Sequence, residues 1–173
     1  MVLWVIAANP LFPAAQGNKW CYGVYYQYGN PENLCYSASC RGDTVELKNP
    51  KEVRRLVIRN DSVMLLGVWK EQGLVSGKEL VLAPDRKPGE SWDWCENGKA
   101  QVLRTETMTV PAGSFDCVVI KKKRWYYAGP EKVWETVIEW WARGVGMVKT
   151  ERTLKTSTHS SGWTWELKSY TLK

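Results

Sequence analysis

The chain has 173 residues, of which 44% are hydrophobic and 24% charged, an ordinary composition for one globular domain. Its 24 Lys and Arg residues outnumber 18 Asp and Glu residues, but the resulting net charge of +6 is spread along the sequence. This distribution argues against a nucleic-acid partner. No apolar run is long enough for a transmembrane segment. We expect no metal site and no cofactor, because His159 is the only histidine and no Cys-x-x-C motif occurs.

The first eight residues, Met1–Ala8, are apolar and look like part of a signal peptide, without the basic start of a complete signal. They fit a first β-strand equally well. We therefore separate an N-terminal segment, residues 1–16, from a single β domain at residues 17–173. A signal remnant indicates a periplasmic, cell-envelope or secreted protein, whereas an authentic N-terminus indicates a cytoplasmic one.

From residue 19 onwards, runs of aromatic and β-branched residues alternate with turn signals, which is typical of successive β-strands. Strands are expected at residues 19–28, 43–48, 52–59, 62–70, 79–83, 91–95, 99–110, 115–127, 133–142, 144–155 and 163–172. Short turns favour antiparallel neighbours, and so long a meander must bend. The prediction is an all-β fold: one highly curved antiparallel sheet of about nine to eleven strands, a half-barrel or incompletely closed barrel.

Five cysteines leave at least one without a partner inside the chain. Cys35 and Cys40 fall in a segment, residues 34–42, that reads as a polar loop, where they could close a small disulfide loop in an oxidising compartment. Two free thiols in a reducing compartment are the alternative. Cys117 lies in an apolar strand and fits a buried, unreactive thiol.

Eleven tryptophans are the most distinctive feature of the composition. Residues two apart share a strand face, so the spacing builds aromatic surfaces. Alternation puts Trp134 and Trp140 on one face of their strand and Glu135, Glu139 and Trp141 on the other, and we expect the Glu face to meet solvent. The aromatic face is either a filled core or a ligand groove. The candidate ligand-binding residues are Trp92, Trp94, Trp134, Trp140, Trp163 and Trp165.

A basic run, residues 121–124, precedes the aromatic residues 125–127. Lys121, Lys123 and Arg124 are candidates for a basic rim that would favour an anionic head group. The run equally suits protection of an exposed sheet edge or pairing with glutamates of the next strand. Glu135 and Glu139 are four residues apart on one strand face, an arrangement that a glycan-active enzyme could use.

Several ordered segments resemble the TapB-like group, a family of bacterial envelope proteins with a domain of unknown function. They lie at residues 11–13, 17–22, 65–68, 88–92, 110–119, 140–149 and 166–170. The resemblance implies a curved antiparallel sheet similar to the half-barrel of bacterial lipoprotein carriers. In those carriers a helix plugs an apolar concave face that can hold acyl chains, and this chain has no segment with the pattern of such a helix.

The sequence favours a non-enzymatic envelope or secreted protein whose concave aromatic face binds a hydrophobic, lipid-like ligand or an apolar segment of a partner protein. Two alternatives stay open: a glycan-active enzyme that uses Glu135 and Glu139, and a structural or interaction protein with a filled core.

Overall fold

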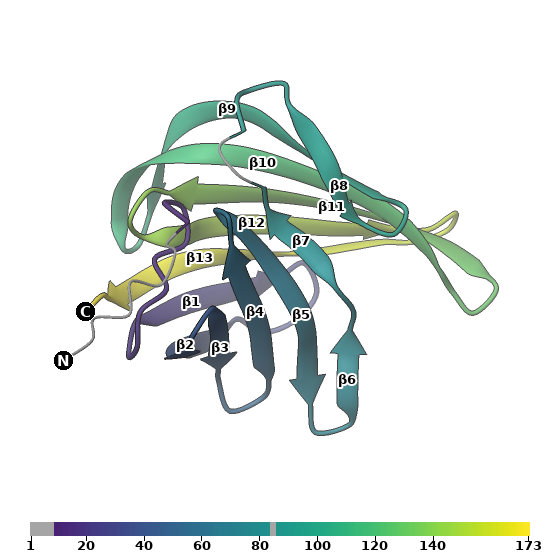
Figure 1. The fold of residues 1–173 in the computed structure, drawn as a ribbon. Coiled ribbons are helices and arrows are strands. Elements are labelled where there is room, and N and C mark those ends of the chain that lie inside the picture. Colours follow the sequence, from purple (N-terminus) through teal and green to yellow (C-terminus); the bar gives the residue numbers. More distant parts are fainter. Residues whose placement is uncertain (1–8, 84–85) are drawn as a thin grey trace.

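The computed structural model describes residues 9–83 and 86–173, which fold into one antiparallel sheet of thirteen strands (Figure 1). The strands are β1 (Lys19–Tyr26), β2 (Glu32–Arg41), β3 (Thr44–Lys48), β4 (Val53–Arg59), β5 (Ser62–Lys70), β6 (Gly73–Ser76), β7 (Glu79–Leu82), β8 (Ser91–Cys95), β9 (Gly98–Val110), β10 (Gly113–Ala128), β11 (Glu131–Ala142), β12 (Gly146–Lys155) and β13 (Ser160–Thr171). The all-β, antiparallel prediction is confirmed, although the strand count exceeds the nine to eleven expected. The two interpretations of Met1–Ala8 concern residues outside the described part of the chain.

The described residues contain no helix, and therefore none that is long and apolar enough to cross a membrane. Two-residue turns of the expected kind join several strands. Asn60 and Asp61 both have positive φ, 47° and 60°, as the turn between β4 and β5 requires.

Two antiparallel meanders, β1 to β6 and β8 to β13, are joined by the pairing of β1 with β13. The hydrogen-bonded order is β6-β5-β4-β3-β2-β1-β13-β12-β11-β10-β9-β8, and β7 pairs with the free part of β5. Over the described residues no backbone ladder joins β7 to β8, although the Trp92 indole donates a hydrogen bond to the Leu80 carbonyl across this seam (3.0 Å). The sheet is therefore strongly curved and open.

Two strands were not expected from the sequence. β6 has only four residues, and β2 lies in the segment read as a polar loop. Serines and cysteines give β2 little β-character, yet Leu34, Tyr36 and Ala38 alternate toward the interior. The alternation of burial, rather than composition, identifies this strand.

Register shifts interrupt several ladders of the sheet, among them those of the long strands β9 to β12. The β9–β10 pairing slips between Val119 and Ile120, and the β11–β12 pairing slips between Trp140 and Trp141; Trp140 lies opposite Val119 in the β10–β11 ladder. Such irregularities increase local bending and twist. They help to curl the sheet around the cavity described next.

Candidate functional site

The concave face of the sheet encloses a cavity of about 350 Å³. Ligand pockets usually span roughly 300–1,000 Å³, so this volume lies at the lower end of the range. Rings and charged groups share the lining, whose main side chains are Phe12, Trp20, Tyr22, Tyr36, Glu52, Arg54, Leu56, Leu65, Lys70, Glu79, Trp94, Lys122, Arg124, Glu139, Trp141, Met147, Arg152 and Trp165. The interior is thus not the purely apolar groove that the tryptophan pattern suggested.

One end of the cavity is closed by the segment that precedes β1. Phe12 is buried, stacks on Trp20 with ring centroids 6.1 Å apart, and meets Trp141 edge-on at 6.4 Å. The segment is tied to the β11–β12 turn, because the Gly144 amide donates to the Pro10 carbonyl (2.9 Å). A short non-helical segment therefore covers the aromatic end of the concave face.

Strand β11 presents the face opposite to the one expected. Glu135, Glu139 and Trp141 are buried on the concave side, whereas Trp134 lies on the convex side and is exposed. The predicted division of these side chains between two faces of the strand is confirmed, but the prediction that the Glu face meets solvent is wrong. The physical reason is that cations on neighbouring strands neutralise both carboxylates, so the Glu face can be buried.

Glu139 pairs with Lys122 of β10, whose side chain is only 2% exposed (Nζ–Oε2 2.8 Å). The same carboxylate accepts a hydrogen bond from the Trp141 indole (2.8 Å). Lys122 also lies 5.5 Å from the centre of the Trp94 ring. A buried charge needs such partners, so these contacts account for a lysine in the interior.

Glu135 holds two cations from the strands on either side of β11. It accepts a hydrogen bond from Arg124 of β10 and forms an ion pair with Arg152 of β12 (Nε–Oε1 3.0 Å). Arg124 also reaches Glu79 of β7 (3.0 Å), and so crosses the open seam of the sheet. Burial alone would lower the pKa of Arg124, but the two glutamates outweigh it and raise the pKa above its usual value.

Arg54 of β4 lies between two rings of the opposite wall. Its guanidinium carbon is 5.2 Å from the centre of the Tyr36 ring and 5.4 Å from that of Trp165, and its Nε donates to Glu52 (2.6 Å). Glu52 also accepts from the Tyr36 hydroxyl (2.6 Å). The Trp165 indole nitrogen is enclosed and has no hydrogen-bond acceptor among the described residues. This wall therefore offers more donors than acceptors.

The six candidate tryptophans do not form one surface. Trp92 and Trp94 are buried on the concave side of β8, and Trp165 lines the cavity, with Trp163 on the same face of β13. Trp134 and Trp140 lie on the other side of β11, so they are not part of the cavity site. The sequence did not identify Phe12, Arg54 or Arg152, although Arg54 shares its strand face with Leu56 and Ile58, and this alternation could have indicated it.

The basic run divides between the two faces of β10. Arg124 and Lys122 point into the concave interior, whereas Lys121 and Lys123 point outward. β10 is paired with β9 and β11, so the edge-protection interpretation is wrong for this run. Pairing with glutamates of the next strand is correct for the two inward residues only. A basic rim made of Lys121, Lys123 and Arg124 together does not exist.

The disulfide joins Cys21 to Cys35, with a sequence separation of 14, and the predicted Cys35–Cys40 bridge is wrong. Cys21 and Cys35 are directly opposite in the β1–β2 ladder, whereas Cys35 and Cys40 lie on opposite faces of one extended strand. Cys117 is a free, buried thiol, as expected, and burial raises its pKa to about 11.

Comparison with known proteins gives a family match over part of the chain and a shared fold. The family model described as DUF3108-like matches residues 98–164. The matching family is a domain of unknown function, and the sequence resemblance also implied such a domain. The assignment to the TapB-like group stays a prediction. No curated protein matches the chain significantly.

Two solved structures share the fold. One, from Bacteroides fragilis, is named a "putative exported protein" with a YmcC-like fold; it aligns over 95% of this chain and 100% of its own, with a TM-score of 0.58 and 15% identity. The other, a "putative lipoprotein" from Parabacteroides distasonis, aligns over 95% of this chain and 99% of its own, with a TM-score of 0.59 and 17% identity. At such identities the likeness concerns the fold alone.

Proposed function

We propose that this protein is a non-enzymatic binding protein of the bacterial cell envelope that takes up an amphipathic ligand with an anionic head group. The observation that carries the proposal is the division of the 350 Å³ cavity, with rings at its closed end and incompletely paired guanidinium groups farther along. The apolar part of the ligand would lie against the rings, and the head group would meet the arginines.

The aromatic end supports an apolar ligand segment. Phe12, Trp20 and Trp141 form a ring cluster there, and Leu56 and Leu65 add aliphatic surface. Each Å² of apolar ligand surface that leaves water contributes roughly 25 cal/mol. A ligand segment of modest length would thus gain several kcal/mol from this end of the cavity.

The excess of cations supports an anionic head group. Five cationic side chains line the cavity or lie at its mouth, whereas four carboxylates are available to them; the cations are Arg54, Lys70, Lys122, Arg124 and Arg152, and the carboxylates are Glu52, Glu79, Glu135 and Glu139. Arg54 and Arg152 each pair through Nε alone among the described residues. Their terminal N–H groups suit the bidentate recognition of a carboxylate or phosphate.

The disulfide and the structural neighbours support an envelope location. Disulfides persist in oxidising compartments such as the periplasm, and Cys21–Cys35 links the first two strands. The two proteins of similar fold are named as exported and as a lipoprotein. Both lines of support point to the same side of the membrane.

The enzyme alternative is less well supported. A glycan hydrolase needs one carboxyl group that donates a proton and one that stays free to attack or to activate water. Glu135 and Glu139 instead hold Arg124, Arg152 and Lys122, with a further bond to Trp141. Neither carboxylate is available for such chemistry without loss of these pairs.

The proposal is tested by native mass spectrometry of the full chain after purification without detergent. We expect an additional mass from a co-purified anionic amphiphile, and we expect its occupancy to fall by tenfold or more in the Arg54→Gln/Arg152→Gln variant. The matched control is Lys121→Gln/Lys123→Gln, which removes two positive charges from the convex face.

Circular dichroism checks that both variants fold. An apo protein that also fails to bind an added fluorescent fatty acid would contradict the proposal and favour the alternative of a structural protein. Equal occupancy in the two variants would contradict the role of Arg54 and Arg152.

A further inference from the structure

A second surface, independent of the cavity, lies on the convex side of the β10–β11 hairpin. Its side chains are lysines and aromatic rings from alternate positions of the two strands. Cross-strand register brings Trp125 opposite Trp134 and Tyr127 opposite Lys132. We define the cationic aromatic face by these members: Lys121, Lys123, Trp125, Tyr127, Lys132 and Trp134.

This face extends beyond the body of the sheet. The pairing of β9 with β10 ends at Gly98 and Arg124, and the pairing of β11 with β12 ends at Trp134 and Lys155. The remainder of the hairpin has no neighbouring strand and projects from the molecule, as Figure 1 shows for the green β10–β11 ribbon. Isolated two-stranded ribbons are marginally stable in water, so the projecting part gains from contact with another surface.

Large rings are exposed on this ribbon. Tyr127 is 64% exposed and Trp134 is 53% exposed. Lys132 lies between two rings, with Nζ 4.1 Å from the centre of Trp125 and 4.5 Å from that of Trp134. These contacts hold the charge and the rings on the same side of the hairpin.

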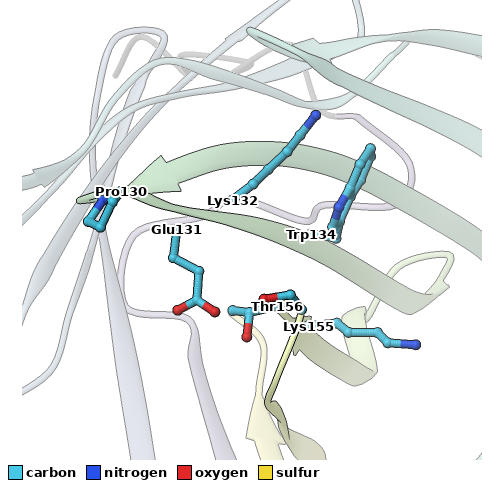
Figure 2. Close-up of a pocket in the computed structure, with 7 residues that line it drawn as sticks. Pro130, Glu131, Lys132, Trp134, Lys155 and Thr156 are labelled. Carbon is cyan, nitrogen blue, oxygen red and sulfur yellow. The ribbon is translucent and has the colours of Figure 1, made fainter.

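No carboxylate lies among the members of the face. Figure 2 shows Lys132 and Trp134 projecting from one side of β11 and Glu131 from the other. A depression of about 750 Å³ adjoins Trp134 at the edge of the face; two lysines, Lys132 and Lys155, and one carboxylate, Glu131, are among its lining residues. Within the described residues, Lys121, Lys123 and Lys155 make no ion pair. The lysines are therefore available to an anionic partner.

We propose that the cationic aromatic face docks onto the surface of a bilayer that contains anionic phospholipids. Tyr and Trp rings favour the head-group level, where an apolar ring and a polar tip are both accommodated. Lysines add electrostatic attraction, and their stems can lie along apolar surface while the ammonium group stays with the phosphates. A convex projecting ribbon reaches a flat surface without displacing any part of the fold.

The test is co-sedimentation of the full chain with vesicles of phosphatidylcholine alone or of phosphatidylcholine mixed with phosphatidylglycerol. We expect partitioning onto the mixed vesicles to be at least about tenfold stronger and to weaken as salt is added. We expect the total tryptophan emission to shift to shorter wavelength on binding, and the shift to be smaller in a variant that lacks Trp134. Equal partitioning onto both kinds of vesicle, or none, would overturn the proposal.

Substitutions locate the surface. Lys123→Glu reverses an exposed charge that has no partner among the described residues, and we expect it to reduce partitioning by roughly tenfold or more. Arg41→Glu makes the same charge change at an exposed position at the end of β2, outside the face, and is the matched control. Tyr127→Ser/Trp134→Ser removes the exposed rings and should weaken binding by roughly tenfold.

An equal loss in Lys123→Glu and Arg41→Glu would show nonspecific attraction to the overall positive charge, and would overturn the assignment to this face. Binding to a single-stranded oligonucleotide in place of vesicles would overturn it as well. Ligand uptake in the cavity, measured separately in the same variants, should stay unchanged.

Discussion

The same two strands, β10 and β11, build two surfaces of opposite character. On the concave side, Lys122 and Arg124 are neutralised by Glu139 and Glu135. On the convex side, Lys121 and Lys123 have no ion-pair partner among the described residues. Adjacent residues of one basic run therefore have different environments, because strand alternation places only every second residue on the face that carries the carboxylates.

The largest expected loss of stability comes from substitution of Lys122, in contrast to its neighbours Lys121 and Lys123. Lys122→Met removes one partner of a buried ion pair and leaves Glu139 uncompensated, which should lower the free energy of unfolding by about 3–5 kcal/mol. Lys121→Met and Lys123→Met should change it by no more than about 0.5 kcal/mol. Urea denaturation followed by circular dichroism measures all three variants.

The double variant Lys122→Met/Glu139→Leu sharpens this prediction. Replacing both partners by apolar residues removes the unpaired charge, so most of the lost stability should return. Equal stability of the Lys121, Lys122 and Lys123 variants would show that the concave and convex positions do not differ in the way described.

Removal of the disulfide, whose cysteines lie on the outer face of β1 and β2, should lower the free energy of unfolding by a smaller amount. Cys21→Ser/Cys35→Ser removes a cross-link with a sequence separation of 14, and a loop of this size should contribute about 3 kcal/mol to the free energy of unfolding. Cys40→Ser, on the free cysteine of the same strand, is the control and should have little effect. Thiol counting under denaturing conditions should find three free thiols in the oxidised protein, and five would contradict the pairing.

The pH dependence of stability tests the charges at the cavity wall. Burial alone would raise the pKa of Glu52, but Arg54, the Tyr36 hydroxyl and Lys70 lower it below the ordinary value of 4.5. A carboxylate with a lowered pKa stabilises the fold above its unfolded pKa, and this contribution is lost as the pH falls through the folded value.

We therefore expect the melting temperature to fall as the pH drops below about 4.5, and to fall less in Glu52→Gln. Glu131→Gln, at the exposed first position of β11, is the control. A Glu52→Gln variant with the same acid dependence as the unchanged protein would contradict the contribution of this pair.

The smallest effect is expected for the exposed rings. Tyr127→Ser and Trp134→Ser should each change the free energy of unfolding by less than about 1 kcal/mol, since Tyr127 loses only its edge-on contact with the Trp125 ring and Trp134 its contact with Lys132. Thermal denaturation measures the change. A loss of several kcal/mol would mean that these rings stabilise the fold, and would weaken the argument that they serve a partner surface.

Much of the fold could be predicted from the sequence because turn signals and alternation are local. The strand at Ser91–Cys95 was predicted with its observed bounds, as was Ser62–Lys70. β2 was missed because serines and cysteines hide a burial pattern that depends on its neighbours, β1 and β3.

The candidate site was harder to predict because alternation assigns residues to two faces but does not say which face is inside. For β11 the hydrophobic rule selected the wrong face, since Glu135 and Glu139 find cations on β10 and β12 that are distant in sequence. The prediction of the disulfide was also wrong because it used proximity along the chain. Cys21 and Cys35 meet through strand pairing, whereas Cys40 is near Cys35 only in sequence.

The central claim is that the concave cavity binds an anionic amphiphile. Its most direct test is calorimetric titration of the delipidated protein with a long-chain carboxylate and with the alcohol of the same chain length. The account predicts that the carboxylate binds at least about tenfold more tightly, and that this preference disappears in Arg54→Gln/Arg152→Gln. Binding of neither ligand, or equal affinity for both, would contradict it.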